Sequence, residues 1–422
     1  MKKKAIYPWV VVGLLWLVGV LNYLDRQMLS TMKPSMMVDI AELAKAESFG
    51  KLMAIFLWIY ALMSPVSGII ADRINRKWLI VASLFTWSSV TLGMAYAQTF
   101  NQLYFLRAVM GVSEAFYIPA GLSLIADYHI GKTRSFAIGI HTTGIYLGQA
   151  LGGFGATIAT SLSWHSTFFI FGMIGVIYSF ILVFFLKEKK IDSATEGRTD
   201  LISEVLSIFK TFRILLGNIA FWVLLFYFSA PSLPGWAVKN WEPTLFSETL
   251  HLDMSQAGPL ATMTTALASL VGVLLGGYFS DRWAQRNVKG RIYTSVAGLS
   301  LTIPALLLLG YGSGFTLILL GGLLFGLGFG IFDVNNMPIL CQFVSSRYRA
   351  TGYGLMNLTG ISAGAIITDF MGRSADAGNM RSDFAGLTLI VAIAIILQLT
   401  MLNPKTVNKT DDKKNRGHYG LY

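Results

Sequence analysis

The segment GIIADRINRK at residues 68–77 returns as GYFSDRWAQR at residues 277–286, and each copy ends a long apolar stretch. Both copies contain a glycine, an Asp-Arg pair that begins four residues later, and at least one further basic residue. The copies begin 209 residues apart, about half of the 422-residue chain. A repeat unit of this length indicates a chain of two similar halves, and it excludes solenoid repeats, whose periods are about 20–50 residues.

The composition places both halves in a lipid bilayer. Hydrophobic residues make up 54% of the chain and charged residues 13%, whereas charged residues are about 25% of a soluble protein. A bilayer core about 30 Å thick needs roughly 20 apolar residues per crossing. Twelve such stretches predict membrane-spanning helices, since an unpaired strand edge cannot lie in lipid. They lie at residues 8–30, 48–71, 78–98, 100–127, 134–160, 164–186, 217–247, 255–280, 292–311, 314–341, 348–371 and 383–402.

The spans group into two bundles joined by a polar linker. We expect an all-α membrane protein whose twelve transmembrane helices form two pseudo-symmetric six-helix bundles, at residues 1–186 and 217–402. The linker at residues 187–216 is polar at first and then amphipathic, which predicts a helix on the membrane surface. The charged tail at residues 403–422 is typical of a solvated, disordered segment.

The basic residues predict the orientation of the chain. Three lysines precede the first span, and the even number of spans brings both termini to one side. That side would hold 25 of the 33 lysines and arginines, which by the positive-inside rule makes it the cytoplasmic side of a bacterial inner membrane. The formal charge of +11 therefore reflects anchoring beside anionic lipid and gives no support for nucleic-acid binding. Six bases are expected on the outer side: Lys33, Lys45, Lys51, Lys239, Arg373 and Arg381.

Several classes of function leave no signal in the sequence. The single Cys341 cannot form an internal disulfide, and no cluster of cysteine and histidine indicates a metal site. No nucleophile motif or phosphate-binding loop indicates an enzyme. The first apolar run is too long for the core of a signal peptide, so we interpret it as the first span. We expect a monomer without a bound cofactor.

Four charged residues in the first half lie within predicted spans: Asp25, Arg26, Arg107 and Glu114. An ionised side chain at bilayer depth costs about 2.5–3.5 kcal/mol and needs a partner, a cavity or a function. Arg107 and Glu114 are seven residues apart, so they share one helix face about 10.5 Å apart along the axis. One interpretation is two structural ion pairs. The other is a site for an anion and a proton, because arginine grips a carboxylate at two points and a carboxyl group in a partly dry cavity can load and release a proton.

The Asp-Arg loop segments, the twelve spans and the long middle loop resemble the major facilitator superfamily over nearly the whole chain. Within it, NYLDR at residues 22–26, the stretch from Arg107 to Glu114 with its following Ala115, Pro119 and Ala120, and WEPT at residues 241–244 resemble the anion:cation symporter family. That family moves organic acids, such as hexuronates, aldonates, aldarates and sialic acid, together with protons. The resemblance implies a proton-coupled symporter that works by alternating access on a small organic anion.

The resemblance also assigns roles to matching residues. Arg26 would clamp the substrate carboxylate, while Asp25 and Glu114 would carry protons and Arg107 would pair with one of them. The fifth span has His141 where the family often has a polar residue facing the sugar, so its role is open between packing and proton relay. Hydrogen bonds to the substrate are expected from Asn22, Tyr23 and Tyr60.

The second half offers polar and aromatic residues at cavity depth. Asp333 is an acid within a span and therefore needs a partner, for which Lys239 or an asparagine is a candidate. The asparagines could instead bond to neighbouring backbone, and both interpretations stay open. The residues expected to hold the substrate in this half are Trp236, Asn335, Asn336 and Asn357.

The loop segments predict a gate on the cytoplasmic face. An aspartate at a helix end can contact a neighbouring helix N-terminus and an arginine across the loop, which would close this face when the cavity opens outward. In the first half we expect Asp72 to contact Arg134, with Arg73 and Arg76 beside them. In the second half, Asp281 and Arg282 would take the same part.

Two other functions remain possible for such a chain. An organophosphate exchanger of the same superfamily normally needs a lysine or arginine from each half, and here the second half offers only Lys239, which we expect near the outer end of its span. A transporter-like sensor would bind a sugar acid and signal through cytoplasmic loops, but the linker and tail are short for a signalling domain.

Overall fold

The computed structural model describes residues 3–129, 133–189, 213–344 and 349–402. The described chain before the linker consists of α1 (Lys3–Leu29), α2 (Lys33–Asp39), the 3-10 helix η1 (Ala41–Ala44), α3 (Ala46–Arg73), α4 (Arg76–Met94), α5 (Phe100–Glu114), α6 (Tyr117–Tyr128), α7 (Arg134–Gly152), α8 (Gly155–Ser161) and α9 (Trp164–Phe185). After the linker follow α11 (Ile219–Leu250), α12 (Met254–Ala284), α13 (Gly290–Tyr311), α14 (Phe315–Asp333), α15 (Asn336–Phe343), α16 (Arg349–Asp376) and α17 (Met380–Met401).

Each of the twelve predicted spans coincides with a helix or with a pair of helices, which confirms the all-α fold class. Three predicted spans are broken in the structure, into α5 and α6, α7 and α8, and α14 and α15. Nine of the described stretches are long and apolar enough to cross a membrane. The other three, at α4, α7 and α16, carry many serines, threonines and glycines, which lower their hydropathy. The predicted surface helix of the linker and the tail lie largely outside the described residues.

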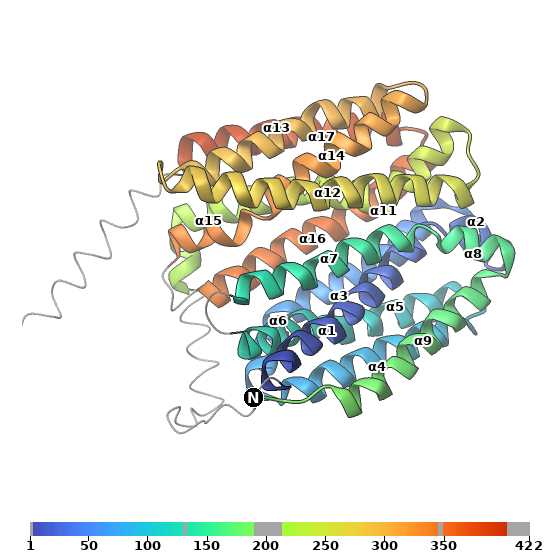
Figure 1. The fold of residues 1–422 in the computed structure, drawn as a ribbon. Helices are drawn as coiled ribbons and strands as arrows, with labels where there is room; N and C mark the ends of the chain where they lie inside the picture. Colours follow the sequence, from blue (N-terminus) through green and yellow to red (C-terminus); the bar gives the residue numbers. More distant parts are fainter. Residues whose placement is uncertain (1–2, 130–132, 190–212, 345–348, 403–422) are drawn as a thin grey trace, which may run out of the picture.

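The helices before and after the linker form two groups that pack side by side. Within the first group, α1 packs on α7 and α4 packs on α9, and within the second, α14 packs on α12 and α13. Figure 1 shows α1–α9 below and α11–α17 above, with α7 and α16 along the junction. The two groups meet where α3 contacts α16 and where α7 contacts α12. The bounds of the two bundles at residues 1–186 and 217–402 stay a prediction.

Glycines let the helices cross at close range. A Cβ atom at Gly148 of α7 would lie 2.3 Å from the carbonyl oxygen of Val20 on α1. A Cβ atom at Gly330 of α14 would lie 2.2 Å from the carbonyl oxygen of Ser269 on α12. No other residue type fits at these crossings, so the glycines allow tight packing where no hydrophobic drive between helices exists.

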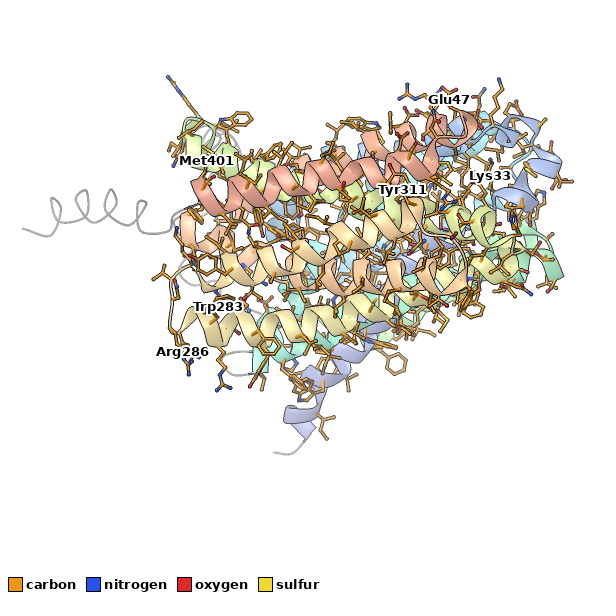
Figure 2. The ribbon with its side chains drawn as sticks, turned by 90° about the horizontal axis from the view of Figure 1, so that it is seen from above. Lys33, Glu47, Trp283, Arg286, Tyr311 and Met401 are labelled. Atoms are coloured by element: carbon orange, nitrogen blue, oxygen red, sulfur yellow. The ribbon has the colours of Figure 1, made fainter. Side chains whose placement is uncertain are left out.

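The molecule has two ends, which we name by what they contain. The terminus end holds the first and last described residues and both Asp-Arg segments, and Figure 2 places Met401, Trp283 and Arg286 there. The far end holds α2, α8 and the loop between α11 and α12, and Figure 2 places Lys33 and Glu47 there.

The described hydrogen bonds between the two halves all lie toward the far end. Asp376 of α16 accepts hydrogen bonds of 2.8 Å from the backbone N–H groups of Ala46 and Glu47 at the start of α3. Side chains donate to backbone carbonyls of the other half in three further bonds, Thr157 to Ser255 at 2.6 Å, Thr262 to Ala150 at 3.0 Å and Gln27 to Lys239 at 2.8 Å. The halves are therefore held shut at this end.

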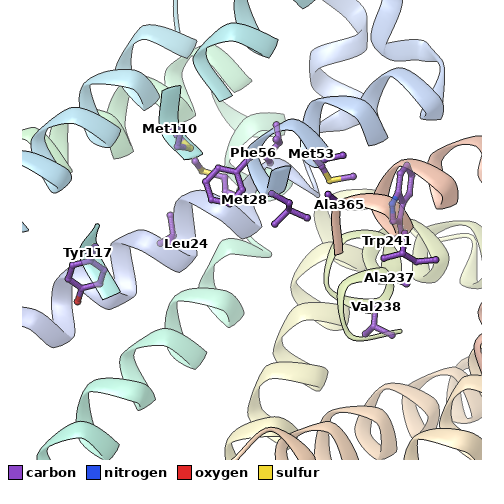
Figure 3. Close-up of a cluster of buried hydrophobic side chains, with 14 of the residues drawn as sticks. Leu24, Met28, Met53, Phe56, Met110, Tyr117, Ala237, Val238, Trp241 and Ala365 are labelled. Atoms are coloured by element: carbon purple, nitrogen blue, oxygen red, sulfur yellow. The ribbon is translucent and has the colours of Figure 1, made fainter. Parts of the chain in front are cut away.

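A proline leaves the backbone carbonyl in one of these contacts free to accept a hydrogen bond. Pro243 lies inside α11 and has no N–H group, so the carbonyl of Lys239 four residues earlier lacks its partner within the helix. Gln27 of α1 donates to that carbonyl instead. Apolar side chains pack where the two halves meet: Figure 3 shows Met28, Met53 and Phe56 of the first half on the side that faces Ala365 and Trp241 of the second half.

Candidate functional site

A cavity of about 380 Å³ lies between the two halves. Its volume falls in the range of about 300–1,000 Å³ that is usual for small-molecule sites. The first half contributes residues of α1, α3, α6 and α7, and the second half contributes residues of α11, α12, α14, α15 and α16. Of the residues predicted to bind substrate, the lining includes Tyr23, Arg26, Tyr60, Trp236, Asn336 and Asn357.

Arg26 is bound at one edge and free at another. Its Nε donates to Oε2 of Glu114 at 2.5 Å, and Asn22 donates to the same oxygen at 2.9 Å. The Nη2 atom of Arg26 is buried and has no hydrogen-bond partner among the described residues. The second oxygen of the fully buried Glu114 also lacks such a partner. An unused guanidinium donor in a cavity wall is a ready contact for an anion.

Three aromatic rings surround the guanidinium. Its Cζ atom lies 4.9 Å from the ring centroids of Tyr23 and Phe56 and 4.6 Å from that of Tyr60. Cation–π contacts of this kind stabilise a positive charge and exclude water from its faces. The rings therefore hold Arg26 against the cavity and leave its edge for hydrogen bonding.

Asp25 and Arg107 lie behind this site. Both are 3% exposed. Thr91 donates to Asp25 over 3.4 Å, and the other carboxyl oxygen of Asp25 has no partner among the described residues. Arg107 lies with its Cζ atom 4.6 Å from the ring centroid of Phe56 and donates to the sulfur of Met110 at 3.2 Å. Of the two arginines, Arg26 is the one that forms a described ion pair with Glu114, where we expected an acid to pair with Arg107.

We expected Lys239 near the outer end of its span, and this prediction is wrong. Lys239 lies inside the protein. Its Nζ atom is 4.6 Å from the ring of Trp236 and 5.1 Å from that of Tyr23, and the residue lines the large cavity. The reason is the length of α11, which continues for eleven residues past Lys239 to Leu250, or about 16 Å at 1.5 Å per residue. Each half therefore contributes one basic side chain to the cavity.

A smaller pocket of about 20 Å³ adjoins these bases. Its lining includes Arg26, Arg107 and Lys239 together with the rings of Tyr23 and Trp236. The three basic residues thus border one small space, with two of them from the first half and one from the second.

His141 of α7 is held by a chain of hydrogen bonds. The hydroxyl of Tyr117 donates its only proton to the carbonyl of Leu15 at 2.7 Å. The hydroxyl oxygen must therefore accept from Nε2 of His141, also at 2.7 Å, which leaves Nδ1 without a proton in the neutral ring. Nδ1 is buried and has no partner among the described residues, although His141 lines the cavity. Nε2 is therefore satisfied by its hydrogen bond to Tyr117, and Nδ1 is an available acceptor.

The asparagines of the second half separate into two groups. Asn336 lines the cavity, where it donates to Asp333 at 3.1 Å and accepts from Tyr227 at 3.1 Å. Asn357 and Asp333 also line the cavity. Asn335 is buried outside the described lining: its amide group donates to the carbonyl of Ile331 at 2.8 Å, and its oxygen accepts from Ser280. Asn335 therefore joins α12 to the break between α14 and α15.

The gate residues are placed only in part. Arg291 pairs with Asp281 at 2.7 Å, while Arg282 donates to the hydroxyl of Tyr278 at 3.0 Å. Arg76 forms an ion pair with Asp127 at the end of α6. The side chains of Asp72 and Arg73 are outside the described part of the structure, so their contact with the exposed Arg134 stays a prediction.

Several lining residues were not singled out from the sequence. On α7 they are Thr142, Tyr146 and Gln149, and on α16 the additional residue is Tyr353. Their spacing of three or four residues, continued by Asn357 four residues after Tyr353, was the available signal. A polar stripe at helical spacing within a span indicates a face turned to water.

The sequence matches a family over nearly its whole length. Residues 15–368, and in a second match residues 232–419, fit the family described as Major Facilitator Superfamily. The chain belongs to the Major Facilitator Superfamily. Such facilitators are membrane transporters, so this member is a multi-pass membrane transport protein and not an enzyme, as its sequence predicts.

Of three curated relatives of this facilitator, two have sugar acids in their names and the third does not. The galacturonate transporter of Dickeya chrysanthemi is 26% identical over 317 residues, which are 72% of this chain and 90% of that protein. The hexuronate transporter of Escherichia coli strain K12 is 25% identical and covers 96% of both chains. Human protein spinster homolog 1 is 26% identical over 71% of this chain and 59% of its own length.

Solved structures show the same fold. The crystal structure of a bacterial homolog of the human lysosomal transporter Spinster, in an inward-facing and unoccupied conformation, aligns with a TM-score of 0.77 over 96% of this facilitator and 98% of that chain, at 20% identity. A nucleoside transporter aligns with a TM-score of 0.73 at 14% identity. Identities this low establish the fold alone.

Proposed function

We propose that this protein takes up an organic anion, a sugar acid such as a hexuronate or an aldonate, together with protons. The observation that carries the proposal is the pairing of Arg26 with Glu114 at the cavity wall. The arginine lines the cavity and has a guanidinium nitrogen without a partner among the described residues, and its one described ion-pair partner is a carboxylate that a proton can neutralise. The names of the galacturonate, hexuronate and galactonate relatives support an acidic sugar as the substrate.

The pairing suggests how proton and substrate are coupled. A proton on Glu114 removes the negative charge that occupies Arg26, so the guanidinium can bind the carboxylate of the substrate. Conversely, a bound anion draws Arg26 away from Glu114 and makes protonation of that acid easier. Each ligand thus favours the binding of the other, so that proton and substrate tend to be bound together. Asp25 is a second proton carrier in this scheme, since it is buried with no described cation bonded to it.

The other polar groups of the cavity suit the rest of a sugar. We assign hydroxyl contacts to Tyr23, Tyr60, Asn336 and Asn357, and a stacking surface to Trp236. Asn22 acts through Glu114, to which it donates a hydrogen bond. Protons are the coupling ion, and we expect a monomer without a cofactor.

The charge distribution supports cytoplasmic termini in a bacterial inner membrane. Described basic residues gather at the terminus end, among them Arg76, Arg134, Lys187, Arg286 and Arg291. Fewer lie at the far end, namely Lys33, Lys45, Lys51, Arg373 and Arg381. With the far end shut and the cavity residues Met337 and Tyr353 each 39% exposed toward the terminus end, this state would open to the cytoplasm.

The test is uptake of labelled galacturonate and galactonate into proteoliposomes under an imposed pH gradient. Arg26→Lys should lower uptake at least tenfold, because a lysine cannot grip a carboxylate at two points. Glu114→Gln should lower accumulation driven by the pH gradient but keep exchange of internal for external substrate, which needs no net proton movement. Arg373→Lys is the matched control, because Arg373 lies at the far end with an exposed side chain. Uptake that ignores the pH gradient, or normal uptake by Arg26→Lys, would refute the proposal.

Lys239 favours a second candidate, exchange of phosphate esters. A dianion is best held by one base from each half, and both bases line this cavity. Liposomes loaded with inorganic phosphate should then take up a labelled sugar phosphate without a pH gradient. Uptake of sugar acids under the pH gradient alone, with no effect of internal phosphate, would exclude this candidate.

A further inference from the structure

Glu242 of α11 is an acid that the scheme above does not use. The residue is 2% exposed, and the hydroxyl of Thr265 on α12 donates to its Oε2 atom at 2.6 Å. Its Oε1 atom has no hydrogen-bond partner among the described residues. That oxygen faces α14, since a Cβ atom on Gly322 would lie 2.8 Å from it. Glu242 therefore lies where three helices of the second half meet.

No described basic group balances Glu242. Lys239, three residues earlier on α11, turns to the rings of Tyr23 and Trp236, and α12 and α14 present Thr265 and Gly322 to the carboxyl group. The other charged residues of α11 and of the helices packed on it lie toward the helix ends: Glu248 on α11, Asp253, Asp281 and Arg282 on α12, Asp333 on α14, Arg349, Asp369, Arg373 and Asp376 on α16, and Arg381 and Asp383 on α17. Burial without a cation strongly favours the neutral acid, because an isolated carboxylate loses its solvation.

Thr265 connects Glu242 to both sides of the membrane in turn. Thr265 itself lines the cavity. One turn away on α12, Thr262 donates to the carbonyl of Ala150 in the other half, one of the contacts that shut the far end. Opening of that contact would let water from the far side reach the same face of α12. The carboxyl group behind Thr265 can therefore exchange a proton with either side, depending on which end is open.

The geometry points to Glu242 as a proton-binding site in the second half of the transporter, which loads at the far side and releases toward the cavity. Binding forms one O–H bond on the carboxylate, and release breaks it with no other change in bonding. Thr265 is the positioning residue, since its hydroxyl can donate to the carboxylate or accept from the acid. The consequence for transport rests on the proposed proton coupling, whereas the protonation of Glu242 does not.

Infrared spectroscopy of the purified protein tests the protonation directly. We expect a protonated-carboxyl band that is lost in Glu242→Gln, a change that keeps the shape of the side chain. Glu248→Gln is the matched control, because it makes the same change six residues later on the same helix at an exposed position. Thr265→Val should keep the band but shift its frequency, because the acid loses its hydrogen-bond partner. A wild-type spectrum whose band is unchanged by Glu242→Gln would overturn the inference.

Proton-to-substrate stoichiometry in proteoliposomes tests the transport consequence. Glu242→Gln should carry one proton fewer per substrate, so that accumulation under a gradient of one pH unit falls about tenfold at zero membrane potential, while substrate exchange continues. Glu242→Asp should restore the wild-type ratio. An unchanged ratio in Glu242→Gln, even with lower stability, would refute the role in coupling. If the wild type moves no protons, the proposed function fails, and the infrared result still decides the state of Glu242.

Discussion

At the scale of single residues, unpaired atoms at the cavity distinguish functional groups from packing groups. Nη2 of Arg26 and Nδ1 of His141 are both buried without a partner among the described residues. Most buried polar atoms in proteins find a partner, so an unpaired polar atom on a residue that lines the cavity is a candidate contact for the substrate. For His141 the fixed Nε2–H makes Nδ1 an acceptor, and a substrate hydroxyl is the fitting donor.

Two substitutions of His141 separate its two ring nitrogens. Glutamine reaches the position of Nε2 and keeps the donor to Tyr117, whereas asparagine reaches that of Nδ1 and keeps the acceptor. We expect His141→Gln to raise KM for a sugar acid roughly fivefold, the value of one hydrogen bond of about 1 kcal/mol, with little change in thermal stability. His141→Asn should keep KM but lower the melting temperature. Equal KM values in His141→Gln and His141→Asn would exclude the acceptor role. So would a rise of KM in His141→Gln that is equally large for a substrate analogue without the contacted hydroxyl.

The charged residues of the site could be predicted from the sequence only in part. Arg26 and Glu114 stood out because charges in apolar spans need a reason, and the structure pairs them. Lys239 was placed too close to the outer end, although the predicted span at residues 217–247 already continues eight residues past it. Its position beside the rings of Tyr23 and Trp236 depends on how the two halves pack, which the sequence does not show. The partner of Arg107 was unpredictable for another reason: the choice between two arginines for one acid is made by helix rotation, which spacing alone does not give.

At the scale of elements, the fold was largely readable because a lipid environment leaves the chain few choices. Apolar length predicted every long helix, and the repeated Asp-Arg segment predicted two halves. The breaks between α5 and α6 and between α14 and α15 were missed although polar residues stand at both of them, Glu114 at the first and Asp333, Asn335 and Asn336 at the second. We interpreted these residues as site groups within continuous spans, and non-helical backbone is tolerated at this depth because it lies within the protein.

The crossing of α7 and α12 allows the far end to close. A Cβ atom on Gly153, at the end of α7, would lie 1.9 Å from Oγ1 of Thr262 and 2.7 Å from the carbonyl of Gly258. We therefore expect Gly153→Ala to hold the far end open and to abolish uptake while substrate binding remains. The measurement is labelling from outside of a cysteine introduced at Thr157, in a chain with Cys341→Ser.

The control for this experiment is Gly13→Ala, because nothing lies within 4 Å of a Cβ atom at that position. Its labelling and uptake should match those of the parent chain. Wild-type labelling in Gly153→Ala would contradict the assignment of this crossing to the closed state.

At the scale of the whole molecule, one carboxylate joins the two halves by capping a helix. Asp376 at the end of α16 accepts from the first two N–H groups of α3, where the positive end of the helix dipole adds to the attraction. We expect Asp376→Ala to weaken the closed far end by about 1 kcal/mol, the usual cost of replacing such a cap by alanine. The open fraction should then rise about fivefold in the same labelling assay.

Salt should distinguish this contact from an exposed ion pair. The cap contains hydrogen bonds to backbone and depends little on ionic strength, whereas pairs between exposed charges weaken as salt is added. Asp369→Asn, which removes the neighbouring pair with Arg373, is the comparison. An Asp376→Ala variant that labels like the wild type would mean that the other far-end contacts suffice for closure.

Pro243 has a consequence for the energetics of transport. The carbonyl of Lys239 that Gln27 occupies is already missing from the internal ladder of α11, so separating the halves leaves every turn of that helix as it was. Water can take the place of the amide at once. Separation of the two halves at this contact then requires no unwinding of α11. The rocking of one bundle against the other can therefore be fast and reversible, with a modest activation barrier.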